Sequence, residues 1–158
     1  MTWEFTMRRT HANALVASTL VLVPLLCAAQ SNPAADAKVV AEATQGRFEY
    51  RNGSYFDKDY EGLAECGAEV IDLNGDGQPE VFTKCYGGMF GMAGVQMDLL
   101  IRGTNGKWVS QFGFPGEYKI LEVKSRGYPD IEILGPGTCF PVWRWNGSAY
   151  AIHKRCDR

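Results

Sequence analysis

The sequence predicts an all-β fold, an antiparallel meander of two to three propeller-blade-like units preceded by a short N-terminal helix or arm. Three observations predict it. Asn-Gly pairs at 52–53, 105–106 and 146–147 separate short runs rich in β-branched and aromatic residues, which is typical of β-hairpins. No stretch after Gly46 has the period or the length of a helix. One segment also recurs later in the chain.

Residues 1–29 have the order of a secretory signal peptide. Arg8 and Arg9 precede an apolar run at 14–26, and Ala28-Ala29 supplies small residues for cleavage after Ala29. The run is too short for a membrane span, which takes about 20 residues. Lipidation of Cys27 is a less favoured alternative, because Leu26 is bulky where a small residue normally precedes a lipidated cysteine. We therefore expect a periplasmic or secreted protein without a transmembrane span.

The mature chain begins with a predicted helix or flexible arm at 30–46 and continues as a single β domain at 47–158. Asn32-Pro33 is a helix start and Gly46 a helix stop. The strands that follow are expected at 47–50, 54–56, 69–73, 80–84, 96–102, 108–114, 118–123, 131–134, 140–145 and 149–154.

An internal repeat organises the β domain. Residues 70–81 align without a gap with residues 120–131. Each copy is followed by an apolar strand ending in Arg, then by Asn-Gly and an aromatic residue, and residues 51–55 are a partial third copy of that hairpin. Two to three such units cannot close a propeller, which needs at least four blades.

Four cysteines follow the leader, an even number suited to an oxidising compartment. Folding the chain at the turn near Gly75 places Cys66 opposite Cys85, and folding it at Asn146-Gly147 brings Cys139 close to Cys156. Cross-strand neighbours have the Cα separation that a disulfide needs. We predict the disulfides Cys66–Cys85 and Cys139–Cys156.

The first copy of the repeat carries a candidate metal loop. Oxygen ligands lie at alternating positions, and a glycine allows the tight turn that brings them together; the predicted Ca²⁺ ligands are Asp72, Asn74, Asp76, Gln78 and Glu80. An EF-hand also needs a Glu at position twelve, where this loop has Thr83, and the flanks are strands. A polar hairpin turn without metal is the alternative, because Asn, Asp and Gly also favour turns.

The second copy has basic residues where the first has ligands. Lys124 and Arg126 replace Asn74 and Asp76, while Glu122 and Asp130 keep the acidic ends. We expect no metal there, and we hypothesise that Arg126 occupies the place of the cation between the two carboxylates.

The loop sequence 72–80 with its flanking strands resembles the calcium loop of FG-GAP or VCBS-type repeats. More loosely, the leader, the mature length, the disulfides and the blade-like sheet resemble small periplasmic inhibitors, which include lysozyme inhibitors and immunity proteins against peptidoglycan hydrolases. That resemblance implies a calcium-binding protein that blocks a hydrolase cleft with a protruding loop. The Ser-Gly-x-Tyr loop of the lysozyme inhibitors is absent from this chain.

A glycine-rich loop at 86–94 is the candidate for such an insertion. It carries the large apolar residues predicted to bind a protein partner, Tyr86, Met89, Phe90 and Met92. The alternative is a loop that folds back over the end of the sheet.

Catalytic motifs are missing from the sequence after the leader. His153 is the one histidine of residues 30–158. The same residues contain neither a nucleophile elbow nor a phosphate-binding glycine loop. Asp57 and Asp59 are a carboxylate pair of the kind that cleaves glycosides. The simpler interpretation is a solvated acidic face that also includes Glu61, Glu65 and Glu69. A net charge of −2 argues against nucleic acid. We expect a non-enzyme, with a structural or carbohydrate-binding envelope module as the alternative to an inhibitor.

Overall fold

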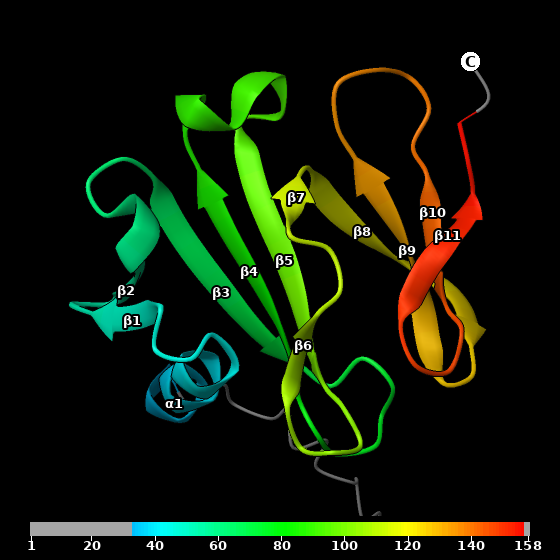
Figure 1. The fold of residues 1–158 in the computed structure, drawn as a ribbon, viewed down its shortest axis with the longest axis horizontal. Coiled ribbons are helices and arrows are strands. Elements are labelled where there is room, and N and C mark those ends of the chain that lie inside the picture. Colours follow the sequence, from blue (N-terminus) through cyan, green and yellow to red (C-terminus); the bar gives the residue numbers. More distant parts are fainter. Residues whose placement is uncertain (1–32, 157–158) are drawn as a thin grey trace, which may run out of the picture. The chain divides into compact units, whose positions relative to one another are not determined.

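The computed structural model describes residues 33–156 and is drawn in Figure 1. The predicted leader and the start of the predicted arm lie outside the described residues. The predicted helix forms as α1 (Pro33–Ala43). It ends as expected, because Gly46 has a left-handed φ of 77° and its N–H donates to Ala41 O at 2.7 Å.

The first sheet continues the chain as an antiparallel meander. Its strands pair in the order β1-β2-β3-β4-β5-β6, with β7 added beside β5. The bounds are β1 (Phe48–Arg51), β2 (Ser54–Asp57), β3 (Glu65–Ile71), β4 (Glu80–Tyr86), β5 (Val95–Arg102), β6 (Trp108–Ser110) and β7 (Phe114–Pro115). Two short 3₁₀ segments, η1 (Lys58–Tyr60) and η2 (Gly88–Ala93), lie in its connections.

The second sheet is a four-stranded antiparallel meander in the order β11-β10-β9-β8. Its strands are β8 (Glu117–Ser125), β9 (Tyr128–Leu134), β10 (Val142–Trp145) and β11 (Tyr150–Lys154). The all-β, antiparallel prediction is confirmed. The expected single strand at 108–114 is instead divided into β6 and β7, because Gly113 takes a left-handed φ of 69°.

The internal repeat appears in the strand registers. Val70 pairs with Val81 in the first hairpin, and Ile120 pairs with Ile131 at the aligned positions of the second. The two copies differ at their tips: the first has a loop at 72–79, and the second has a tight turn at 126–127 with a register shift in β8. The partial third copy is the β1–β2 hairpin, which joins the edge of the first sheet.

Two apolar clusters cover the opposite faces of β4. Phe82 packs with Leu99 and Ile131 between the two sheets, and its ring stacks on Tyr118 at 3.8 Å between centroids. Val81 points the other way, into a cluster with Val40 of α1. Burial on both faces leaves Tyr86 as the one exposed residue of β4, and even Glu80 and Thr83 are buried.

Both predicted disulfides form. Cys66 and Cys85 are register partners on β3 and β4, with Cα atoms 4.1 Å apart. Cys139 and Cys156 join the β9–β10 connection to the C-terminal segment, with Cα atoms 5.6 Å apart. Two disulfides are consistent with a secreted protein. Within residues 33–156, no helix is long and apolar enough to cross a membrane.

The meander gives the β domain two ends that carry different sets of loops (Figure 1). The hairpin end carries the turns 72–79, 103–107, 126–127 and 146–149. The η2 end carries residues 61–64, η2 and the connection 135–141. Consecutive antiparallel strands alternate between these ends, so the two predicted sites, the Asp72 loop and the glycine-rich loop, lie far from each other.

Candidate functional site

The Asp72 loop at the hairpin end is built around one carboxylate. Asp72 accepts hydrogen bonds from the backbone N–H groups of Gly75 at 2.7 Å, Asp76 at 3.2 Å and Gly77 at 2.9 Å. These bonds, that of Gly77 first, hold the pKa of Asp72 below its ordinary value. Left-handed φ angles of 82° at Gly75 and 84° at Gly77 let the chain close round the carboxylate.

Asn74 and Asp76 lie on the exposed side of the same loop. Asn74 Nδ2 donates to Asp76 Oδ2 at 2.9 Å, and Asp76 Oδ1 accepts the Gln78 N–H at 2.7 Å. The alternating spacing predicted from sequence therefore does bring Asp72, Asn74 and Asp76 into one tight loop.

Glu80 plays a different part from the other predicted ligands. Its side chain is 2% exposed, and its two oxygens accept the Leu73 N–H and the Tyr128 hydroxyl, each at 2.8 Å. Burial raises the pKa of Glu80. Burial and the hydrogen bond to Glu80 also raise the pKa of Tyr128. Glu80 thus supports the loop from below and ties it to the second sheet.

The donor set of this loop suits a hard cation in type. Carboxylate and amide oxygens are the ligands that calcium prefers, and an oxygen that accepts one N–H retains a free lone pair. Asp72 Oδ2, Asn74 Oδ1 and both oxygens of Asp76 each accept one hydrogen bond and lie in an exposed loop, whereas both oxygens of Glu80 are buried beneath it. Over residues 33–156, no three His, Cys, Asp or Glu side chains gather as a group that could hold a metal ion.

The second copy of the repeat neutralises its buried carboxylate in another way. Asp130, the counterpart of Glu80, is buried and accepts from Arg144 Nε at 3.0 Å and Nη2 at 2.7 Å. The hypothesis that Arg126 fills the place of a cation is wrong. Arg126 stands at the tip of a tight turn, and its side chain lies against Gly147, where a Cβ would come within 3.0 Å of Nη1.

The glycine-rich loop at the η2 end presents apolar side chains to solvent. Met92 is 91% exposed, and Met89 and Tyr86 are exposed as well. Phe90 is buried instead, with its ring edge-on to Tyr60 at 5.1 Å between centroids. The loop is closed at its base by a hydrogen bond from Gly87 N to Gly94 O at 2.9 Å. Phe90 therefore positions the loop, while Tyr86, Met89 and Met92 remain at the surface.

Leu63 adds to this apolar surface, although it was not among the residues expected from the sequence. It is 68% exposed, and with Phe56 and Tyr86 it lines a hollow of about 500 Å³. A second hollow of about 340 Å³ lies between Met92 and Leu134. A lone leucine after Gly62 in an otherwise polar stretch was the available signal. We call Leu63, Tyr86, Met89 and Met92 the apolar end surface.

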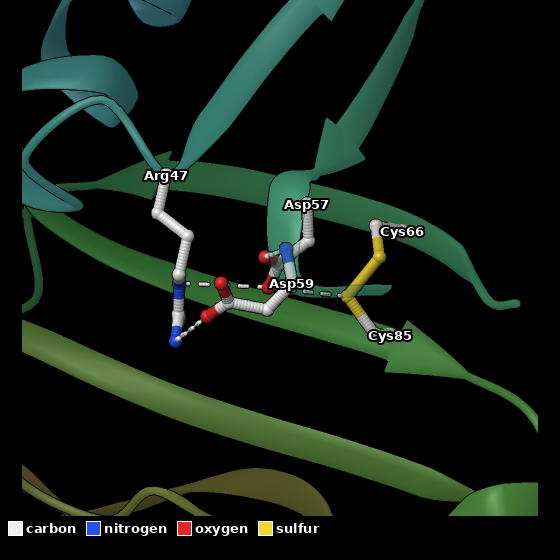
Figure 2. Close-up of a disulfide and its surroundings, with 5 residues drawn as sticks. All are labelled: Arg47, Asp57, Asp59, Cys66 and Cys85. Atoms are coloured by element: carbon white, nitrogen blue, oxygen red, sulfur yellow. Dashed lines mark hydrogen bonds and ion pairs between the residues drawn. A yellow bond between two sulfur atoms is a disulfide. The ribbon is translucent and has the colours of Figure 1, made fainter. Parts of the chain in front are cut away.

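Asp57 lies beside the Cys66–Cys85 disulfide, as Figure 2 shows. Its side chain is buried, its Oδ1 accepts the Asp59 N–H at 3.0 Å, and its Oδ2 lies 3.5 Å from Arg47 Nε. The Cys85 sulfur is 3.9 Å from Oδ2; a disulfide sulfur carries no hydrogen, so this is a contact only. Burial raises the pKa of Asp57.

The expected solvated acidic face is therefore wrong at Asp57, because β2 turns that side chain inward onto the disulfide. Asp57 and Asp59 share Arg47, whose Nη1 is 3.8 Å from Asp59 Oδ2. Arg47 and Asp57 border a cavity of about 230 Å³ that also has Asp98 in its wall. Asp98 there accepts hydrogen bonds from Ser110 and Phe112. The arrangement is an ion-paired support for the β1–β2 hairpin.

Comparisons with protein-family models, with curated proteins and with solved structures give no match. Function is therefore inferred from the chemistry of the residues described above.

Proposed function

We propose that this protein binds another protein through the apolar end surface and acts as an inhibitor or immunity protein of a peptidoglycan hydrolase. The observation that carries the proposal is the exposure of Met92 and Met89 on a loop that is held in shape by Phe90 and by the Gly87–Gly94 hydrogen bond. Methionine adapts to irregular apolar grooves. A loop that is ordered before binding loses less conformational entropy in the complex.

Charge supports a basic partner. After the predicted leader, residues 30–158 carry 16 − 2 = 14 basic and 18 − 1 = 17 acidic side chains, a net charge of 14 − 17 = −3. Glu65 and Glu117 border the two hollows beside the apolar end surface. An enzyme that works on an anionic cell wall gains from a cationic surface, and such a surface would be steered toward these carboxylates.

Calcium has a supporting role in the same proposal. We assign Asp72, Asn74, Asp76 and the Gln78 carbonyl as its ligands, with Glu80 holding the loop beneath it. A bound ion would lock the hairpin end and stabilise the fold, because it binds the folded loop and not the unfolded chain. It would lie at the end of the domain opposite to the partner surface.

The test is inhibition of lysozymes and peptidoglycan amidases that hydrolyse suspended cell walls. Met92→Asp and Met89→Asp place a charge in the apolar end surface, and we expect each to weaken inhibition about tenfold or more. Val123→Asp is the matched control, because Val123 is also an exposed apolar residue but lies on β8 near the hairpin end. Phe90→Ala changes no exposed side chain but removes the packing that positions the loop, so it should also weaken inhibition.

Equal inhibition by the wild type and both methionine variants would refute this surface. Retention on purified peptidoglycan with no effect on any hydrolase would instead favour the structural or carbohydrate-binding envelope module.

A further inference from the structure

A third hollow lies at the hairpin end, where turns from both sheets meet. Its volume is about 580 Å³, within the range of small-molecule sites. The Asp72 loop contributes Asn74, Asp76 and Gln78 on one side. The turns at 103–106 and 147–148 close the other sides, and Tyr128 and Trp145 line it as well. We call this hollow the hairpin-end pocket.

Trp145 reaches this pocket because of its place on β10. Trp143, two residues earlier, packs inward against Phe112 and Phe114, at 5.3 and 5.8 Å between centroids. Trp145 is only partly buried and is supported by Tyr128 at 4.5 Å and by Tyr150 at 5.5 Å. These contacts hold a large aromatic side chain in place at the wall of the pocket, where it can pack on an apolar ligand face.

The polar groups of the pocket are mainly amides and hydroxyls. Asn and Gln side chains donate and accept at once, which matches ligand hydroxyl groups that do the same. Gln78 is exposed, and no hydrogen bond of its side chain is found among the described residues. Asn105 uses its Oδ1 for the Lys107 N–H at 3.0 Å, which leaves its amide N–H groups for a ligand.

Charge argues against an anionic ligand. Arg102 is the one basic side chain that lines the pocket among the residues described. Its guanidinium already pairs with Glu42 at 2.8 Å and lies over the Trp108 ring at 4.6 Å. While the Asp72 loop holds no calcium, Asp76 adds a negative charge to the opposite wall, so the binding test is made in calcium-free buffer. A phosphate or carboxylate would therefore meet a carboxylate and an arginine that is already committed.

We propose that the hairpin-end pocket binds a neutral saccharide, with the apolar face of a sugar ring packed on Trp145 and its hydroxyl groups bonded by Gln78, Asn105 and Ser148. The site is separate from the apolar end surface and does not depend on a protein partner. It would place the protein on a glycan while the η2 end stays free.

The proposal is tested by titrating the full protein with N,N′,N″-triacetylchitotriose and with cellotriose. Binding is monitored by tryptophan fluorescence and by backbone amide NMR shifts. We expect saturable shifts at 103–106 and 146–149 and none at 86–94. Gln78→Ala should raise the dissociation constant about two- to tenfold, the range of one lost hydrogen bond. Trp145→Phe should raise it by a similar or larger factor.

Gln78→Ala keeps the test falsifiable if Trp145→Phe fails to fold, because Gln78 is an exposed side chain on a loop. Met92→Ala at the η2 end is the control and should bind both sugars as the wild type does. The proposal is overturned if neither sugar shifts these turns at about 10 mM, which corresponds to negligible affinity. It is equally overturned if Gln78→Ala binds unchanged, or if inorganic phosphate binds more tightly than either sugar.

Discussion

The ion pair beside the Cys66–Cys85 disulfide allows a double-mutant cycle on Arg47 and Asp57 (Figure 2). Arg47→Met leaves the Asp57 carboxylate buried without its cation, whereas Asp57→Asn removes the buried charge and leaves Arg47 half-exposed to water. In the Asp57→Asn variant, the side-chain amide oxygen can still accept the Asp59 N–H. We therefore expect Arg47→Met to destabilise the protein and Asp57→Asn to change its stability little.

The separation and the exposure of the pair set the size of the effect. Two unit charges 3.5 Å apart attract by about 1 kcal/mol in water and by about 5 kcal/mol at an effective dielectric constant of about 20. Arg47 is 39% exposed and Asp57 is 1% exposed at the side chain, so screening places the coupling in the lower part of that range. We expect a coupling free energy of about 1–3 kcal/mol.

The pH dependence gives an independent check. Burial raises the pKa of Asp57 above its ordinary 3.8, so the folded state favours the protonated form. The stability that the raised pKa of Asp57 contributes is complete below about pH 3.8, and it is lost as the pH rises through that raised pKa. Asp57→Asn removes this loss. The stability of the variant relative to the wild type should therefore increase as the pH rises through that window.

Urea unfolding of the wild type, the two single variants and the double variant measures the cycle. Lys58→Met is the matched control: Lys58 Nζ lies closer to its partner, 2.6 Å from Glu49 Oε1, but both side chains are exposed. That variant should cost about 0–1 kcal/mol. The reasoning fails if Lys58→Met costs as much as Arg47→Met, or if Asp57→Asn is the more damaging member of the cycle at neutral pH.

Two further predictions concern the Asp72 loop. Calcium at about a hundredfold excess over its dissociation constant should stabilise the fold by about 2.7 kcal/mol and raise the melting temperature by about 8–12 °C. Asp76→Ala should abolish this shift in melting temperature. An equal shift in the variant would place the ion elsewhere. In the absence of calcium, Glu80→Ala should lower the free energy of unfolding in urea by about 2–5 kcal/mol, because the Leu73 N–H and the Tyr128 hydroxyl both lose a buried acceptor. Glu80→Gln keeps one acceptor and should cost about 1 kcal/mol. Equal losses in the two variants would contradict the hydrogen-bonding role of Glu80.

Turn chemistry and strand alternation predicted the meander and the disulfides because both are local properties of the chain. Once Asn146-Gly147 specifies a hairpin, its two strands run side by side and Cys139 approaches Cys156, although the register itself, with Trp145 opposite Tyr150 and a shift after Val142, does not follow from the turn. The repeat was predictable for the same reason, since aligned residues such as Val70 and Ile120 occupy equivalent register positions. Strand ends were less predictable: β3 begins at Glu65 rather than 69, because pairing with β4 continues as far as Tyr86.

The burial of particular side chains was decided by tertiary structure alone. Glu80 and Asp76 look equivalent in the sequence, but only Glu80 turns inward, where Tyr128 from the other sheet supplies a donor. Phe90 and Met92 share one loop, yet Phe90 is buried against the distant Tyr60 whereas Met92 is exposed.

By itself, then, the sequence determined the fold class, the pairing of neighbouring strands and the cysteine pairs of this protein, because each depends on neighbours along one or two strands. Tertiary structure decided which carboxylates are buried, which apolar side chains stay at the surface, and where Trp145 and Gln78 come to line one pocket. These depend on packing between segments that no local pattern connects.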